Sequence, residues 1–242
     1  MPKFILAIVL LVANEAAIGM PLKLEIADVS VCAAALTDSS LQEQIHRITS
    51  HSKIEAALEK LGKVYRSGWQ RRKIPDNLGE TVLQHSIKVF HAALSYPIHT
   101  HHLDRNRMAL MSLFHDFAEH IVPDFTPHDN ISNEQKHALE KQAIVELIED
   151  AGADGDLILS LWEEYESQKT AESKIVFQLD KLDAAIQAFE YKKMGFSVSD
   201  FFPYTESKLS DPLLIAILRD LQKMPNITKA YDYFFRQLSS VH

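Results

Sequence analysis

The chain has 242 residues, of which 46% are hydrophobic, so it can bury the core of one large domain or two small ones. Its formal net charge of −8 argues against a nucleic acid polymer as partner, and any phosphate group must be met by local arginines. The single cysteine, Cys32, excludes an internal disulfide bond and a cysteine-based zinc site.

The beginning of the chain is predicted to form an N-terminal extension over residues 1–50. Residues 4–13 form an apolar run that is too short to span a bilayer, so no stable membrane span is expected. We favour a buried strand or short helix docked on the domain of a cytoplasmic protein. The alternative is export with residues 1–19 as a cleaved signal peptide, because the run has the length of a signal-peptide core. Residues 22–36 begin with the alternation of a strand.

From about residue 40 the chain reads as helix after helix. An apolar stripe predicts a helix over residues 54–64, a polar stretch with Pro75 predicts a loop over residues 66–79, and the next helix covers residues 80–94. Asp104 caps a helix that is predicted to continue to about His120 and to end before Pro123.

Capping signals mark the later helices. Ser132 and Gln135 form a capping box for a helix over residues 133–151, and Asp211 with Pro212 starts a helix over residues 213–223. Further helices are predicted over residues 156–166, 171–194 and 226–238. The expected fold class is all-α: a helical bundle over residues 51–223, preceded by the N-terminal extension and followed by a C-terminal helical tail over residues 224–242.

The pair His115–Asp116 lies inside an apolar helical run. Burying a charge is costly unless it is paired or bound to a metal. On a continuous helix the two side chains point about 100° apart, and Glu119 shares their face. A lone histidine would be read as a core residue, but the set of three predicts a functional site.

Two more candidate residues come from other predicted helices. His85 lies on the apolar side of its helix, and Asp180 lies beside the apolar stripe of the helix over residues 171–194. Asp183 is a rival to Asp180, and we prefer Asp180. The two histidines and two aspartates together offer nitrogen and oxygen donors for a divalent metal ion, without distinguishing manganese, cobalt, iron, zinc or magnesium.

Several linked motifs carry a resemblance to a known family. The order of His85, His115–Asp116 and Asp180 resembles the H…HD…D signature of the HD-domain metal-dependent phosphohydrolases. The HDxxE…GDxTP stretch of the 5′-deoxynucleotidases in that superfamily is similar to His115-Asp116-x-x-Glu119 followed by Asp124-x-Thr126-Pro127. The likeness covers roughly residues 52–222 and includes Gly68-Trp69-x-x-Arg72. The chain departs from the family at Pro123, where a glycine is usual, and at Thr81, where a serine is usual.

The resemblance implies an HD-domain helical bundle that holds one divalent metal ion through His85, His115, Asp116 and Asp180. It also implies the reaction, hydrolysis of a deoxyribonucleoside 5′-monophosphate to nucleoside and phosphate. Glu119 would position or deprotonate the attacking water, and Asp124 would protonate the leaving 5′ oxygen or order the site.

Substrate binding needs positive charge, because a phosphate monoester is dianionic. Arg66 and Arg72 are the candidates, while Arg71 fits the motif less well. Trp69 is expected to stack on the sugar or base. The implied partner is a small-molecule nucleotide, and the sequence leaves a homodimer open.

Two other functions stay open from the sequence. One is a di-iron oxygenase on the same scaffold, with His128 and His137 as the extra histidine ligands. The other is a non-catalytic nucleotide-binding protein with a structural metal. Glu119 argues against the second alternative, because a structural site needs no spare carboxylate.

Overall fold

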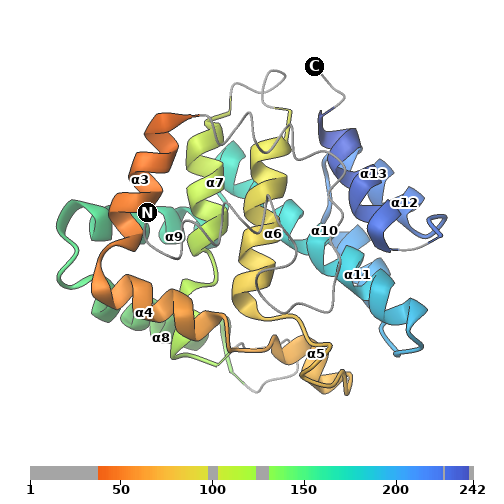
Figure 1. Ribbon diagram of the computed structural model, residues 1–242, viewed down its shortest axis with the longest axis horizontal. Coiled ribbons are helices and arrows are strands. Elements are labelled where there is room, and N and C mark those ends of the chain that lie inside the picture. The colour runs from red at the N-terminus through yellow and green to blue at the C-terminus, as the bar shows by residue number, and fades with distance from the viewer. Residues whose placement is uncertain (1–37, 98–102, 124–130, 226, 240–242) are drawn as a thin grey trace.

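The computed structural model describes residues 38–97, 103–123, 131–225 and 227–239. Their architecture is all-α, as predicted, and the only extended pairing among them is an isolated bridge between Tyr65 and Thr81. No helix in the described part of the chain is long and apolar enough to cross a membrane. The helices (Figure 1) are α3 (Ser39–Thr49), α4 (Ser52–Leu61), α5 (Ser67–Arg71), α6 (Val82–Ser95), α7 (Arg105–Phe114), η2 (Phe117–His120), α8 (Asn133–Ile148), α9 (Gly152–Ser167), α10 (Ala171–Lys193), α11 (Phe201–Lys208), α12 (Pro212–Leu221) and α13 (Ile227–Ser239).

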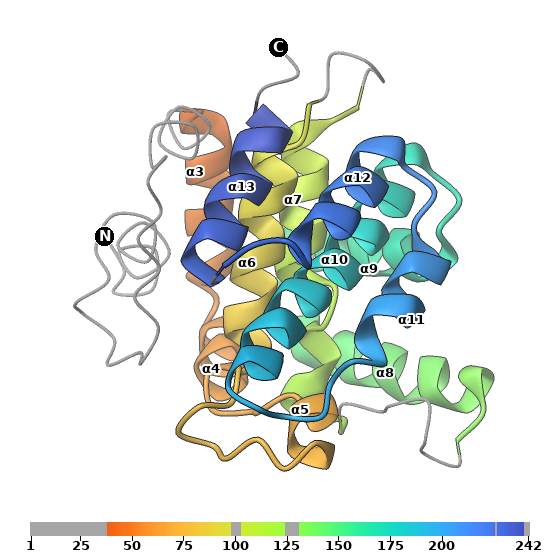
Figure 2. The same ribbon diagram turned by 90° about the vertical axis from the view of Figure 1, so that its right-hand side faces the viewer.

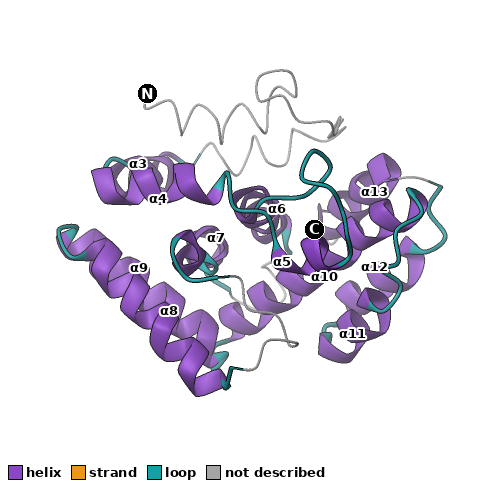
Figure 3. Cartoon of the chain, turned by 90° about the horizontal axis from the view of Figure 1, so that it is seen from below, coloured by secondary structure: helices purple, strands orange, loops and turns teal. Residues whose placement is uncertain are grey.

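Helices α6, α7 and α10 form the centre of the bundle. Helix α10 is buried on nearly every side between Val176 and Tyr191, as expected for a core helix rather than a surface helix. It packs against α6 and α7, with α9 on one flank and α11, α12 and α13 on the other. Figure 3 shows this arrangement from below, with α8 beside α9. The centre is therefore built from helices that carry the predicted metal ligands.

Local capping fixes where the central helices begin. Thr81 caps α6 in a reciprocal capping box with Gln84, so threonine fills this position as serine would. The capping box of Ser132 and Gln135 on α8 is confirmed. Asp104 accepts a hydrogen bond from the backbone amide of Arg107 at 2.9 Å, which confirms it as the cap of α7.

The helix predicted to continue to His120 is broken at His115. Helix α7 ends at Phe114, Asp116 leaves helical geometry with φ −99° and ψ 20°, and the turn η2 follows. The Nδ1 atom of His115 lies 2.7 Å from the carbonyl oxygen of Ser112, which a continuing helix would use for the amide of Asp116. The imidazole thus takes the place of a backbone donor, and the prediction of one helical face for the whole motif was wrong.

Three further differences concern short helices. The predicted loop over residues 66–79 contains α5, and the helices α3 and α11 were not predicted. Helix α11 carries Pro203 in its first turn, where proline costs no hydrogen bond. Helix α3 begins at the Asp38 cap and is anchored by the ion pair of Arg47 with Asp154 of α9. The strand and signal-peptide predictions for residues 1–37 lie outside the described residues.

Candidate metal centre

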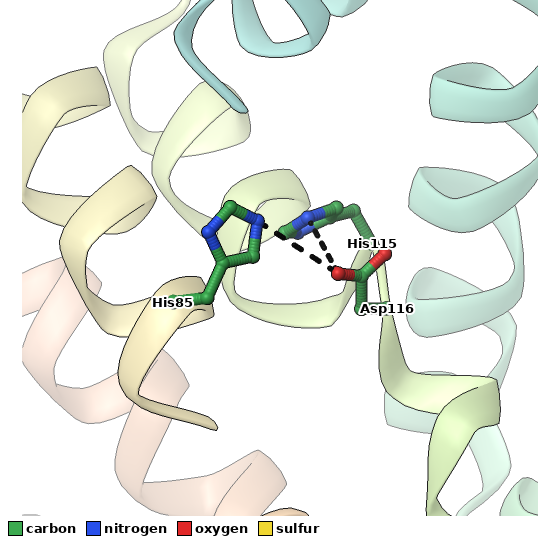
Figure 4. Close-up of side chains that lie close together, drawn as sticks. All are labelled: His85, His115 and Asp116. Atoms are coloured by element: carbon green, nitrogen blue, oxygen red, sulfur yellow. Dashed lines mark ion pairs between the residues drawn. The ribbon is translucent and has the colours of Figure 1, made fainter. Parts of the chain in front are cut away.

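Four side chains from α6, the end of α7 and α10 converge at the centre of the bundle. The Nε2 atom of His85 lies 3.1 Å from Oδ1 of Asp180 and 3.8 Å from Oδ2 of Asp116. The Nε2 atom of His115 lies 3.2 Å from the same Asp116 oxygen. Figure 4 shows the two imidazoles turned toward the Asp116 carboxylate. His85, His115 and Asp116 therefore form one group spaced closely enough to hold a metal ion, and Asp180 adjoins this group through its contact with His85.

The two histidines are oriented as metal ligands are. Each Nδ1 atom has a hydrogen-bond partner, Asp183 at 2.8 Å for His85 and the Ser112 carbonyl at 2.7 Å for His115. Each Nε2 atom is buried and makes no hydrogen bond. A proton on Nδ1 leaves the Nε2 lone pair available, which is the tautomer of a histidine ligand with a fixed outer partner. The residues thus fit a divalent cation.

The spacing of the donor atoms supports the same fit. Ligand atoms about 2.1 Å from a common cation lie about 3.0 to 3.4 Å from one another in octahedral or tetrahedral geometry. The separations of His85 from Asp180 at 3.1 Å and of His115 from Asp116 at 3.2 Å fall in this range. The separation of His85 from Asp116, at 3.8 Å, is slightly longer.

Asp180 is held so that only one of its oxygens faces His85. Its Oδ2 atom accepts a hydrogen bond from the hydroxyl of Tyr165 at 2.7 Å and pairs with Nζ of Lys181 at 2.7 Å. Burial alone would raise the pKa of Asp180, but Lys181 and His85 hold this pKa well below its ordinary value. The carboxylate is therefore ionised, with Oδ1 aimed at His85.

The pKa values of Asp116 and His85 are also shifted by their neighbours. Burial raises the pKa of Asp116, but His115, His85 and Arg66 outweigh it and lower the pKa. Burial and Arg66 lower the pKa of His85, whereas Asp180 and Asp183 raise it to about 9. A compact set of ionised carboxylates around imidazoles is what a bound cation would stabilise.

Asp183, the rival to Asp180, lies on the opposite edge of the His85 ring. With Glu80 and His85 it forms a second group spaced closely enough for a metal ion. The ammonium of Lys88 is already there, since it contacts the Glu80 carboxylate and lies 3.5 Å from Oδ2 of Asp183. The ammonium of Lys88 thus neutralises this second group, and Asp183 orients the His85 ring through Nδ1.

The two predicted catalytic carboxylates are Glu119 and Asp124. Glu119 lies in η2, is only 8% exposed, and its backbone amide donates to the carbonyl of Asp116 at 3.1 Å. It is therefore one turn away from the metal-facing pair. Asp124 lies outside the described residues.

The predicted substrate residues are separated by the structure. Arg66 borders the centre, with Nη1 3.7 Å from Oδ2 of Asp116. Arg72 pairs instead with Asp200 and lies over the ring of Phe201, 5.7 Å from its centroid. Arg71 is exposed. Of the arginines that the sequence offered, Arg66 is the one next to a candidate ligand.

Trp69 does not fit the role expected from the sequence. Its side chain is 2% exposed, stacks on Phe201 with ring centroids 4.4 Å apart, and donates from Nε1 to Oε2 of Glu80 at 2.8 Å. A ring packed in this way cannot also stack on a nucleotide without repacking its neighbours. The structure therefore argues for Trp69 as a support of Glu80.

Sequence reasoning missed two lysines near the centre. Lys181 directly follows Asp180 and contacts it, and its Nζ atom lies 4.9 Å from the centroid of the Phe177 ring. Lys136 of α8 pairs with Glu140 at 2.9 Å, and its pKa is raised by Glu140 and, more weakly, by Asp116, against the effect of burial. The position of Lys181 beside a candidate ligand was the signal that could have found it.

The extra histidines of the di-iron alternative do not join the four donors in the described structure. His137 stacks on Trp162 with centroids 5.0 Å apart and lies 3.5 Å from Oε2 of Glu166. His128 lies outside the described residues. Among the described residues, His137 thus lies outside the donor group of His85, His115 and Asp116.

Comparisons with known proteins agree with this geometry. A family described as HD domain matches residues 58–210. The 5′-deoxynucleotidase HDDC2 of Bos taurus is 34% identical over 170 residues, which cover 69% of this chain and 81% of that protein. The 5′-deoxynucleotidase HDDC2 of Danio rerio is 36% identical over 168 residues, covering 67% of this chain and 82% of its own.

Solved structures support the fold. The crystal structure of a protein from Magnetospirillum magnetotacticum, titled a predicted metal-dependent phosphohydrolase, superposes with a TM-score of 0.51. The likeness covers 86% of this chain and 97% of that one, at 19% identity. At this identity the likeness concerns the arrangement of helices.

Proposed function

This chain belongs to the HD domain family, and we propose that it hydrolyses deoxyribonucleoside 5′-monophosphates to nucleoside and phosphate. It is an HD-domain phosphohydrolase, a class to which its relatives named 5′-deoxynucleotidase also belong. The observation that carries the proposal is the orientation of His85 and His115, whose hydrogen-bond-free Nε2 atoms face the carboxylates of Asp116 and Asp180.

The enzyme uses a divalent metal ion, and we propose that one ion is held by His85, His115, Asp116 and Asp180. When bound there, it would supply Lewis acidity toward water and toward a phosphoryl oxygen. Lys88 supports a single metal ion, because its ammonium already occupies the neighbouring group of Glu80 and Asp183.

The phosphate of the substrate is proposed to bind beside Arg66, with Lys181 adding positive charge from behind Asp180. Both side chains contact a candidate ligand, Asp116 for Arg66 and Asp180 for Lys181, so both cations border the same centre. A dianionic phosphate needs such cations in a chain whose formal net charge is −8. The planar guanidinium of Arg66 can bind two phosphate oxygens at once, and Lys181 adds a point charge.

Glu119 is proposed as the general base. Its carboxylate would take one proton from the attacking water as the new phosphorus–oxygen bond forms. The bond from phosphorus to the 5′ oxygen then breaks, and the leaving oxygen needs one proton, which we assign to Asp124 as in the family motif. The products are a nucleoside with a free 5′ hydroxyl and inorganic phosphate.

A phosphate-release assay tests the proposal directly. The purified chain is loaded with Mn²⁺ or Co²⁺ and given each deoxyribonucleoside 5′-monophosphate beside its ribonucleoside counterpart. We expect phosphate release from the deoxyribonucleotides, slower release from the ribonucleotides, and loss of both after chelation. An equal preference for ribonucleotides would overturn the sugar assignment, and no release from any mononucleotide would overturn the substrate class.

Two expectations from the sequence remain predictions alongside this proposal. Cytoplasmic localisation can be tested by fractionation together with mass determination of the intact chain. A homodimer can be tested by light scattering of the purified protein.

A further inference from the structure

The C-terminal helix α13 reaches the back of the metal centre although it lies beyond the matched residues 58–210. It packs against α6 and α10, the helices that carry His85 and Asp180. Figure 2 shows α13 lying along α6. Its residue Tyr231 is 3% exposed, so its hydroxyl is turned into the protein and away from solvent.

The hydroxyl of Tyr231 belongs to a continuous chain of hydrogen bonds. It donates to Oδ1 of Asp183 at 3.1 Å and accepts from Nζ of Lys88 at 2.9 Å. The other oxygen of Asp183, Oδ2, lies 2.8 Å from Nδ1 of His85. His85 and Asp183 are buried almost completely, at 0% and 1% exposure. Only the Asp183 carboxylate separates the tyrosine from a candidate metal ligand.

We propose that Tyr231 is a positioning residue for the metal centre, because it fixes the carboxylate that orients His85. This inference rests on the proposed function only in taking His85 as a metal ligand. The outer partner of a ligating histidine sets its tautomer and ring orientation, so a change there alters metal affinity. The C-terminal helix α13 then helps to orient a metal ligand, in addition to packing against α6 and α10.

The contacts of Asp183 explain why Tyr231 is needed to keep this carboxylate oriented toward His85. Lys88 lies 3.5 Å from the same oxygen that faces His85, and it competes with the imidazole for that oxygen. The Tyr231 hydroxyl donates a hydrogen bond to the other oxygen of Asp183, Oδ1, and so fixes the carboxylate. It also accepts a hydrogen bond from the ammonium of Lys88. Burial and the Asp183 charge raise the pKa of Tyr231 well above its ordinary value, so the hydroxyl stays a donor.

The same helix supplies a matched control. Tyr233 also donates its hydroxyl to a carboxylate, Oδ2 of Asp220 in α12, at 2.9 Å. Tyr231→Phe and Tyr233→Phe each remove one hydroxyl that donates to a carboxylate, and Tyr231→Phe also removes the acceptor of the Lys88 hydrogen bond. Only the hydrogen bond from Tyr231 to Asp183 leads to His85.

The test measures metal binding by the full chain, without substrate. The affinity for Mn²⁺ and Co²⁺ is obtained by competition with a chelating indicator, and visible absorption of the Co²⁺ form reports ligand geometry. We expect Tyr231→Phe to weaken binding about tenfold, the lower end of the effect of lost outer partners, and to shift the Co²⁺ spectrum. Tyr233→Phe should leave the metal affinity and the Co²⁺ spectrum unchanged, even if the two variants lower the melting temperature equally.

Asp183→Asn shows whether Tyr231 acts through Asp183. The loss caused by Tyr231→Phe should shrink in the Asp183→Asn background, because contacting residues on one path are not additive. Equal binding by the wild type and Tyr231→Phe, or an equal loss in Tyr233→Phe, would overturn the inference. A tenfold loss in Tyr231→Phe alone would support it even if no nucleotide were hydrolysed, so the two proposals fail separately.

Discussion

Oδ1 of Asp180 lies 3.1 Å from Nε2 of His85, across the interface of α10 and α6. The other oxygen of Asp180 is occupied by Tyr165 and Lys181, and the other nitrogen of His85 is occupied by Asp183. Each side chain is therefore held from behind and presents one atom to the centre. This preorganisation is what allows buried charges to remain in a helical core.

Removing a ligand should abolish metal binding while the fold survives. Asp116→Ala deletes the carboxylate that both histidines face, so we expect Co²⁺ and Mn²⁺ affinity to fall at least a hundredfold and hydrolysis to stop. Asp200→Ala is the control, because Asp200 pairs with Arg72 and is exposed. Metal analysis after dialysis measures the difference. Full metal occupancy in Asp116→Ala would contradict its role as a ligand.

Glu119 should behave differently from the ligands. Glu119→Gln keeps the size and polarity of the side chain but cannot accept a proton from water. We expect unchanged metal content and a loss of kcat of about 10² to 10⁴, the usual contribution of a general base. Single-turnover phosphate release from a deoxyribonucleotide measures it. A variant with normal kcat would show that another group takes the proton.

Arg66 and Arg72 can be separated by their effect on substrate binding. Arg66→Met should raise KM for the deoxyribonucleotide at least tenfold, because a charge-assisted contact to phosphate is lost beside Asp116. Arg72→Met removes a partly exposed cation paired with Asp200 and should change KM less than threefold. Initial rates at several substrate concentrations give both values. The reverse ranking would move the phosphate site toward α5 and α11.

The sequence predicted well what depends on near neighbours. The cap of α8 at Ser132 and the cap of α7 at Asp104 are set within three residues, so their signals survive in any tertiary context. The end of α7 could not be read in this way. It depends on whether the His115 imidazole or the Asp116 amide takes the Ser112 carbonyl, and both choices fit the apolar pattern.

For the candidate metal centre, the sequence nominated residues but did not decide between rival ligands. The choice between Asp180 and Asp183 stayed open because α10 is buried on nearly all sides, so hydrophobic periodicity does not mark one face. Only the tertiary contacts put Asp180 at Nε2 of His85 and Asp183 at Nδ1. The burial of Trp69 against Phe201 also depends on tertiary contacts that a sequence motif does not reveal.

His91, a second histidine of α6, should make the fold sensitive to acid. It is 3% exposed, its Nε2 atom has no hydrogen-bond partner, and burial lowers its pKa from 6.5 to about 4. Well above pH 6.5 the residue is neutral in both the folded and the unfolded chain and contributes nothing to the pH dependence. Between pH 6.5 and about 4 the unfolded chain binds a proton that the folded chain excludes, so the free energy of unfolding falls as the pH falls.

The pKa shift of His91 sets how far the free energy of unfolding falls in acid. At about 1.4 kcal/mol per pH unit, the loss attributable to His91 approaches about 3 kcal/mol near pH 4. His91→Met keeps a buried side chain of similar length and removes the titration. Urea unfolding of the two proteins with chelator present, at pH 7.5, 6 and 5, should give stability curves that converge or cross as the pH falls. Parallel curves would mean that His91 is protonated equally in both states, and the acid sensitivity would then have to come from the carboxylates around His85.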